Sequence, residues 1–249
     1  MGKTIICAAN WKMNKGPQET KSFLKGLRAD LSMDHLQAVV IFPPAINLLV
    51  ARDILKGSAI GWGAQNCHPA DSGAFTGENS PALLKSLGAT HCLVGHSERR
   101  TLFGESNEFC AKKVVAIQKQ GMVPVLCLGE TLQQREKGET NQVIVEQLTA
   151  SLAGVDWKKP FWVAYEPVWA IGTGQVATPA QANTAHQVLR TQLKEMTKTG
   201  THIPLLYGGS VKPENAHELA LEKEVDGFLI GGASLHLESF IQIFNQANP

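Results

Sequence analysis

Eight short apolar segments, separated by stretches with helical spacing, constrain the fold of this chain most strongly. Their residues do not alternate between apolar and polar, which is typical of parallel strands covered by helices. Eight strand–helix units in 249 residues leave about 31 residues for each, the size of a βα repeat. The expected strands are Thr4–Asn10, Gln37–Phe42, Ala59–Ala64, Thr90–Val94, Met122–Cys127, Phe161–Tyr165, Pro204–Tyr207 and Val225–Ile230.

Two of the intervening segments carry clear helix boundaries. Thr178 is a good N-cap, Pro179 suits the first helical position, and apolar residues recur on one face as far as Met196. A second helix is predicted to begin at Ser106 and to stop at Gly121.

This order of elements predicts an α/β protein with a closed (β/α)8 barrel, in which helices ring a parallel eight-stranded sheet. An open, doubly wound sheet is the alternative. Since no linker rich in Pro, Gly or Ser and no shift in composition divides the chain, residues 1–249 are expected to form a single barrel domain.

Composition and charge narrow the partners and the compartment. A net charge of +1 gives no sign of a nucleic-acid or acidic-membrane partner. No apolar run reaches the length of a membrane span, and the first residues lead into a strand rather than a signal peptide. The five cysteines are odd in number and form no Cys-x-x-Cys pair, which favours a reducing compartment. We therefore expect a cytoplasmic protein.

The residues suited to chemistry all follow predicted strands. In (β/α)8 barrels the active site lies at the carboxyl ends of the strands, so a whole set at that end is more informative than any single motif. The set comprises Asn10 and Lys12 after the first strand, Gly95–Arg100 after the fourth, Glu166 after the sixth, Gly208–Ser210 after the seventh, and Gly231 and Gly232 after the eighth.

Glu166 is the predicted acid or base. It ends an apolar strand, and Pro167 cannot extend the ladder. The apolar loop that follows contains two glycines and is expected to act as a lid that excludes water. Taken alone, the same pattern fits a solvated glutamate beside a packed loop. The expected lid residues are Pro167, Val168, Trp169, Ala170, Ile171, Gly172, Thr173 and Gly174.

The glycine pairs after the seventh and eighth strands predict a phosphate site. Backbone N–H groups approach a phosphate closely where no Cβ blocks them, and these two turns are a common phosphate site in barrels. A single pair would indicate only a tight turn. Lys12 is expected to supply the only nearby full positive charge.

His96 precedes a short helix-like stretch, so the helix N-terminus is expected to keep its imidazole neutral and able to donate a hydrogen bond to a carbonyl oxygen. We interpret Glu98, Arg99 and Glu105 as a supporting ion-pair network. Cys127 is expected to pack beneath the site.

Cofactor and metal motifs are absent or misplaced. Gly172–Ala177 matches the dinucleotide fingerprint, which must lie directly between a strand and its helix. Five residues separate it from Glu166, and the expected helix starts only at Thr178, so we reject the match. The histidines show no H-E-x-x-H spacing, and no Walker-type lysine loop exists. We predict neither a metal nor a cofactor.

Four ordered segments resemble the signature segments of the triosephosphate isomerase family, and the similarity runs along essentially the whole chain. The segments are Ala9–Lys12, Gly95–Arg100, Ala164–Gly174 and Tyr207–Ser210. The resemblance implies interconversion of dihydroxyacetone phosphate and D-glyceraldehyde 3-phosphate through an enediolate, without a cofactor, in glycolysis and gluconeogenesis.

The resemblance also implies a role for each matching residue. Glu166 resembles the base and His96 the neutral electrophile known in that family. Asn10 and Lys12 resemble the groups that hold the substrate, and Glu98 resembles a partner of Lys12. Ser97 and Cys127 would lie next to the catalytic residues and support them without touching the substrate. The phosphate would be held by Gly172, Ser210, Gly231 and Gly232.

The family further implies a homodimer. The segment Gln65–Asn79 is long for a loop and carries Phe75 near its tip, so we expect it to dock into a partner. In the family, the residue that matches Thr76 reaches toward the neighbour's site. Asn79 stands where the family has an aliphatic residue, and His91 replaces an aromatic.

Two other classes remain open from the residues alone. One is a different phosphate-binding barrel enzyme that uses other acids or a metal. The other is a sugar-phosphate binder without turnover.

Overall fold

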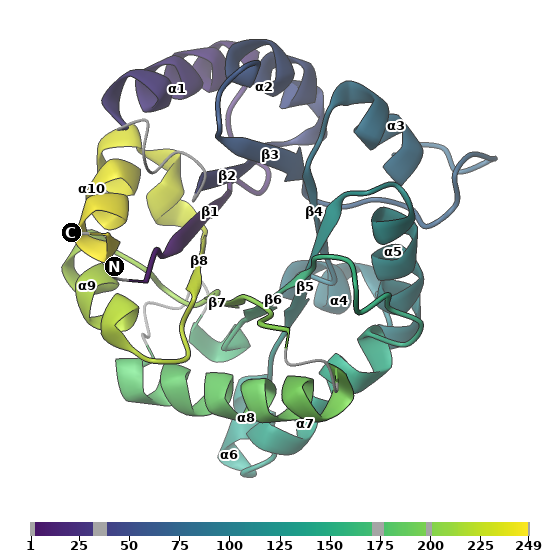
Figure 1. The fold of residues 1–249 in the computed structure, drawn as a ribbon, viewed down its shortest axis with the longest axis vertical. Helices are drawn as coiled ribbons and strands as arrows, with labels where there is room; N and C mark the ends of the chain where they lie inside the picture. The colour runs from purple at the N-terminus through teal and green to yellow at the C-terminus, as the bar shows by residue number, and fades with distance from the viewer. Residues whose placement is uncertain (1–2, 32–38, 171–176, 198–200, 249) are drawn as a thin grey trace.

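The computed structural model describes residues 3–31, 39–170, 177–197 and 201–248. Within these residues, eight strands close into a barrel in sequence order, and every strand is parallel to both neighbours (Figure 1). The closed barrel predicted from the sequence is confirmed, and the open sheet is wrong. The strands are β1 (Ile6–Asn10), β2 (Val39–Phe42), β3 (Gly61–Ala64), β4 (His91–Val94), β5 (Val123–Leu128), β6 (Trp162–Tyr165), β7 (Leu205–Tyr207) and β8 (Gly227–Ile230).

Helices ring the barrel on its outer face (Figure 1). They are α1 (Pro17–Asp30), α2 (Leu48–Leu55), α3 (Pro81–Leu87), α4 (Ser97–Phe103), α5 (Asn107–Lys119), α6 (Leu132–Glu136), α7 (Thr140–Ser151), α8 (Pro179–Thr197), α9 (Pro213–Leu221) and α10 (Leu237–Ala247). The described residues also form the short 3-10 helices η2 (Ala45–Asn47), η3 (Val168–Ala170) and η4 (Gly232–Leu235).

Both helix starts predicted from the sequence are confirmed by their caps. The hydroxyl of Thr178 accepts the Gln181 N–H at 3.2 Å, and the Gln181 side chain accepts the Thr178 N–H at 3.0 Å. The hydroxyl of Ser106 accepts the Phe109 N–H at 3.2 Å at the start of α5. Gly121, just beyond α5, has a φ of +66°, a conformation that favours glycine.

The apolar core has two layers. One lies between the strands and the helices, and the other fills the barrel interior. At the inner layer, His91 lies edge-on to Phe42, and its ring centroid is 4.5 Å from that of Trp162. Burial lowers the pKa of His91 to about 4, so it serves as a neutral ring in place of the aromatic residue expected there. Because side chains fill the interior, the barrel has no room for a ligand inside it, and the ends of the strands are where a site is expected.

The first and the last described segments lie side by side (Figure 1). The Asn248 side chain accepts the Ile5 N–H at 2.7 Å and donates to the Ile5 carbonyl at 3.2 Å, which fastens the C-terminus beside β1. All five cysteines are buried and free of disulfides. Over the described parts of the chain, every helix is too short or too polar to traverse a bilayer.

Candidate active site

A cavity of about 420 Å³ lies at the carboxyl ends of the strands and collects most of the predicted residues. Among those that line it are Asn10, Lys12, His96, Glu166, Ser210, Gly231 and Gly232. The predicted phosphate ligand Gly172 and the lid positions Ile171, Thr173 and Gly174 lie outside the described residues.

Several lining residues were not predicted. Lys212 also faces this cavity, so the expectation that Lys12 is its only nearby cation is wrong. Lys212 directly precedes Pro213, the first residue of α9, and it lies two residues beyond Ser210. Its closeness in sequence to Ser210, a predicted phosphate ligand, could have indicated that Lys212 lies at the site. The unpredicted part of the wall also includes Trp11, Asn14, Val211, Leu229, Ala233 and Leu235.

Glu166 is a buried carboxylate with two partners. One oxygen, Oε1, lies 3.0 Å from Nε2 of His96, and the other, Oε2, accepts the Ser97 N–H at 2.8 Å. Burial raises the pKa of Glu166, but the contacts with His96 and Ser97 outweigh it, and the net pKa is lowered. The carboxylate is therefore ionised near neutral pH, as a general base must be.

His96 caps the N-terminus of α4, as its position before a short helix predicted. Its Nδ1 accepts the Glu98 N–H at 3.3 Å, which leaves Nε2 as the ring's donor. Burial lowers the pKa of His96, the Glu166 carboxylate raises it, and the net direction is upward. The hydrogen bond from the Glu98 backbone N–H favours the neutral ring instead, because an imidazolium has no lone pair to accept it.

The α4 backbone fixes the hydrogen bond between the Glu98 N–H and Nδ1 of His96. The Glu166 contact would instead be replaced by a substrate bound between the two side chains. The neutral ring is thus the form suited to act on a substrate, and it stays a prediction.

Lys12 is held in an unusual backbone conformation with a φ of +51°. The Asn10 side chain accepts its N–H at 3.0 Å, and the Gln65 side chain donates to its carbonyl at 2.8 Å. Its ammonium lies 2.6 Å from a carboxylate oxygen of Glu98, the partner expected for it. The hydrogen bonds of the Asn10 and Gln65 side chains therefore hold Lys12 in a strained backbone conformation that directs its ammonium toward the cavity.

The glycines at the ends of β7 and β8 differ in what requires them. A Cβ on Gly208 would lie 2.9 Å from Cγ of Glu166, so this glycine makes room for the base. A Cβ on Gly232 would meet nothing within 4 Å, and one on Gly231 would come only as near as 3.7 Å to Lys12. The backbone at Gly231 and Gly232 is therefore open to the cavity, as a phosphate site requires.

The described part of the predicted lid, Pro167–Ala170, is anchored to a residue that the sequence analysis did not select. Glu130, which is fully buried, accepts from the Trp169 indole at 2.9 Å and from the Tyr165 hydroxyl at 3.0 Å. Arg135 completes the group, 3.3 Å from Glu130 and stacked over the Trp169 ring. Glu130 follows β5 as Glu166 follows β6, and this parallel was the available signal.

The ion-pair network expected beside the site is present in a different form. Arg99 pairs with Glu105, and the buried Lys113 joins them at 2.6 Å from Glu105. Glu98 belongs to Lys12 instead. Cys127 packs in the barrel interior, as predicted, where burial raises the pKa of its thiol well above the ordinary value. No cluster of three or more potential metal ligands occurs among the residues whose positions are described.

Comparison with known proteins agrees with this arrangement. The family model for triosephosphate isomerase matches residues 5–247. A triosephosphate isomerase from Bdellovibrio bacteriovorus is 50% identical, over 96% of this chain and 98% of that protein. Those from Chlamydia muridarum and Nitrosococcus oceani are 45% and 42% identical, over 95% and 98% of this chain and over 89% and 99% of the relatives. The chain belongs to the triosephosphate isomerase family and carries that family's isomerase activity.

Proposed function

We propose that Glu166 moves the proton between C1 and C2 of the triose phosphate, while His96 polarises the carbonyl. The observation that carries this assignment is the pairing of a buried carboxylate with a histidine Nε2 at 3.0 Å, at the wall of one cavity. Glu166 takes a proton from C1 of dihydroxyacetone phosphate and returns it to C2 of the enediolate. His96 donates a proton from Nε2 to the C2 oxygen, which carries the developing charge, and then accepts the proton of the C1 hydroxyl at the same nitrogen, so that the carbonyl moves from C2 to C1.

Lys12 and Asn10 act on the same intermediate. The ammonium of Lys12 stabilises the negative charge of the enediolate and of the phosphate. Asn10 binds substrate and also fixes the backbone of Lys12 through the 3.0 Å bond described above. The phosphate is held by the backbone at Gly231 and Gly232, by Ser210, and by Gly172 of the lid. Closure of the proposed lid, Pro167–Gly174, keeps water from the enediolate, which would otherwise eliminate its phosphate.

This chemistry needs a base, an electrophile and a cation, all of which the chain supplies. Protein treated with excess chelator and freed of nucleotides is therefore expected to interconvert the two triose phosphates as fast as untreated protein. A chromatographic or NMR assay without coupling enzymes measures this directly. Loss of turnover that a divalent cation or a nicotinamide restores would contradict the assignment and favour a different barrel chemistry.

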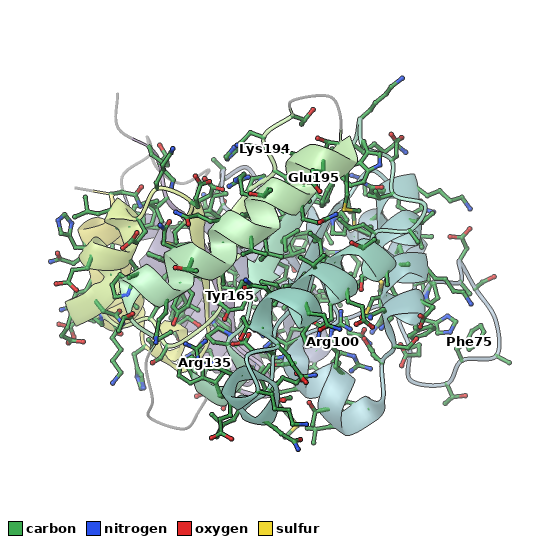
Figure 2. The ribbon with its side chains drawn as sticks, turned by 90° about the horizontal axis from the view of Figure 1, so that it is seen from below. Phe75, Arg100, Arg135, Tyr165, Lys194 and Glu195 are labelled. Carbon is green, nitrogen blue, oxygen red and sulfur yellow. The ribbon has the colours of Figure 1, made fainter. Side chains whose placement is uncertain are left out.

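The chain forms a homodimer through the loop at residues 65–79. Figure 2 shows Phe75 on a segment that projects beyond the helices. Phe75 is 46% exposed, and its ring stacks on that of His68 with 3.8 Å between the ring centroids, which stiffens the projecting loop. A groove of about 670 Å³ opens beside Lys12 and His96 and has exposed apolar walls at Met13, Leu102 and Phe103. The loop of a second copy, with Thr76 near its tip, would fill this groove.

A charge placed in the groove tests the dimer. Leu102→Asp is expected to convert the dimer to a monomer in sedimentation velocity and to lower kcat, since the groove adjoins Lys12 and His96. Leu221→Asp is the matched control, because Leu221 on α9 is 72% exposed and Leu102 is 73% exposed. A monomeric parent protein, or equal dissociation of both variants, would refute this interface.

The protein acts in the cytoplasm, where the reaction serves glycolysis and gluconeogenesis. Membership of this family and five buried cysteines without a disulfide support this proposal.

A further inference from the structure

Gly129, the residue directly after β5, has both of its backbone polar groups bound by one side chain. The Gln147 amide oxygen accepts the Gly129 N–H at 2.9 Å, and the Gln147 amide nitrogen donates to the Gly129 carbonyl at 3.1 Å. Gln147 belongs to α7, outside the barrel, and it does not line the cavity. A single helix side chain therefore fixes one peptide segment at the end of β5.

The segment that Gln147 fixes lies directly against the backbone of Glu166. The Glu166 N–H donates to the Leu128 carbonyl at 2.8 Å, and the Val168 N–H donates to the Glu130 carbonyl at 3.1 Å. Between these two bonds, a Cβ on Gly129 would lie 1.7 Å from the Glu166 carbonyl oxygen. The two backbones touch at this point, so a displacement of Gly129 displaces Glu166.

We propose that Gln147 is a positioning residue for the isomerisation, which acts by holding Gly129 and, through it, the backbone of Glu166. This inference rests on the proposed role of Glu166 as the base. A base misplaced by about 1 Å loses up to ~100-fold in rate, because proton transfer needs hydrogen-bond reach. Gln147 has no comparable link to the phosphate site, which is built on the loops after β7 and β8.

Gln147→Leu removes both hydrogen bonds at nearly constant side-chain volume. We expect kcat to fall about 10-fold, with KM and the affinity for 2-phosphoglycolate within about 2-fold of the parent protein. Gln147→Glu keeps the acceptor but loses the donor at neutral pH, so its kcat should lie between those of the parent and Gln147→Leu. Gln147→Glu also provides the test of the proposal if Gln147→Leu fails to fold.

Gln118 provides a matched control. Its side chain makes the same pair of hydrogen bonds with the backbone of Asp156: it accepts the Asp156 N–H at 2.9 Å and donates to the Asp156 carbonyl at 3.2 Å. Asp156 precedes β6 and so lies toward the other end of the barrel from Glu166. Gln118→Leu is expected to lower the melting temperature at least as much as Gln147→Leu while leaving kcat within about 2-fold.

A double-variant cycle tests whether Gln147 acts through Glu166. In a Glu166→Gln background, Gln147→Leu should lower kcat by less than 2-fold, because the group it positions is already gone. An equal loss in both backgrounds, or a kcat for Gln147→Leu like that of Gln118→Leu, would overturn the proposal. A Glu166→Gln enzyme with normal turnover would instead overturn the role of Glu166 itself, so the two failures are distinguishable.

Discussion

Replacing Glu166 with Gln is expected to lower kcat by at least about 100-fold with little loss of ligand affinity. Glutamine keeps the shape of the side chain and can still accept the Ser97 N–H. It cannot take a proton from C1. The phosphate contacts lie on other strands, so affinity for 2-phosphoglycolate, measured by calorimetry, should change by only a few-fold.

Glu224→Gln is the control for the loss of a carboxylate. Glu224 is paired with Arg190 at 3.1 Å and lies before β8, toward the end of the barrel that carries no predicted site residue. Its kcat should stay within about 2-fold of the parent value. If Glu166→Gln turned over at a near-normal rate, Glu166 would not be the base.

Replacing Lys12 with Met is expected to weaken binding of 2-phosphoglycolate by at least about 100-fold. Two unit charges 4 Å apart attract by about 4 kcal/mol at an effective dielectric constant near 20. Part of that energy is already offset, because the Lys12 side chain is 29% exposed and its ammonium pairs with Glu98 at 2.6 Å. About 2.7 kcal/mol remains as a reasonable net loss, and isothermal calorimetry at low salt would measure it.

Lys212→Met is the informative comparison, because Lys212 lines the same cavity but its residue is exposed to solvent. Its substitution should weaken 2-phosphoglycolate binding by less than about 10-fold, since solvent screens an exposed charge. Unchanged affinity in Lys12→Met, or a larger loss of affinity in Lys212→Met, would show that Lys12 does not supply the main charge that binds the anion.

The fold could be predicted because its signals are local. Unbroken apolar runs mark strands covered on both faces, and caps such as Thr178 and Ser106 act within a few residues of themselves. The end of the barrel that carries the site also followed from local order, because Asn10, His96 and Glu166 each come at or just beyond a strand end.

The contacts that support the site were less predictable, because they join residues far apart in sequence. Gln147 reaches Gly129 across 18 positions, and Trp169 reaches Glu130 across 39. Helical periodicity indicates which face of α7 is apolar, but it does not indicate which polar side chain meets a given peptide group. Lys113 is another contact that could not be predicted. A lysine within a helical pattern is expected to be exposed to solvent, but Lys113 is buried and paired with Glu105.

Gly208 shows how a correct location can have a different cause. The sequence suggested that both glycine pairs leave room for a phosphate. In the structure both pairs line the cavity, but a Cβ on Gly208 would meet the Glu166 side chain, whereas one on Gly231 or Gly232 would come no nearer than 3.7 Å to another group. Which atom lies opposite a missing Cβ depends on the register between β6 and β7, which the sequence does not display.

Deuterium exchange at C1 tests the central claim most directly. The protein is incubated with dihydroxyacetone phosphate in D₂O, without metal or nicotinamide, and NMR follows both deuterium at C1 and the appearance of D-glyceraldehyde 3-phosphate. We expect exchange together with product formation in the parent protein, and loss of both in Glu166→Gln. Binding of the substrate with neither exchange nor product, or exchange that survives in Glu166→Gln, would contradict proton transfer by this carboxylate.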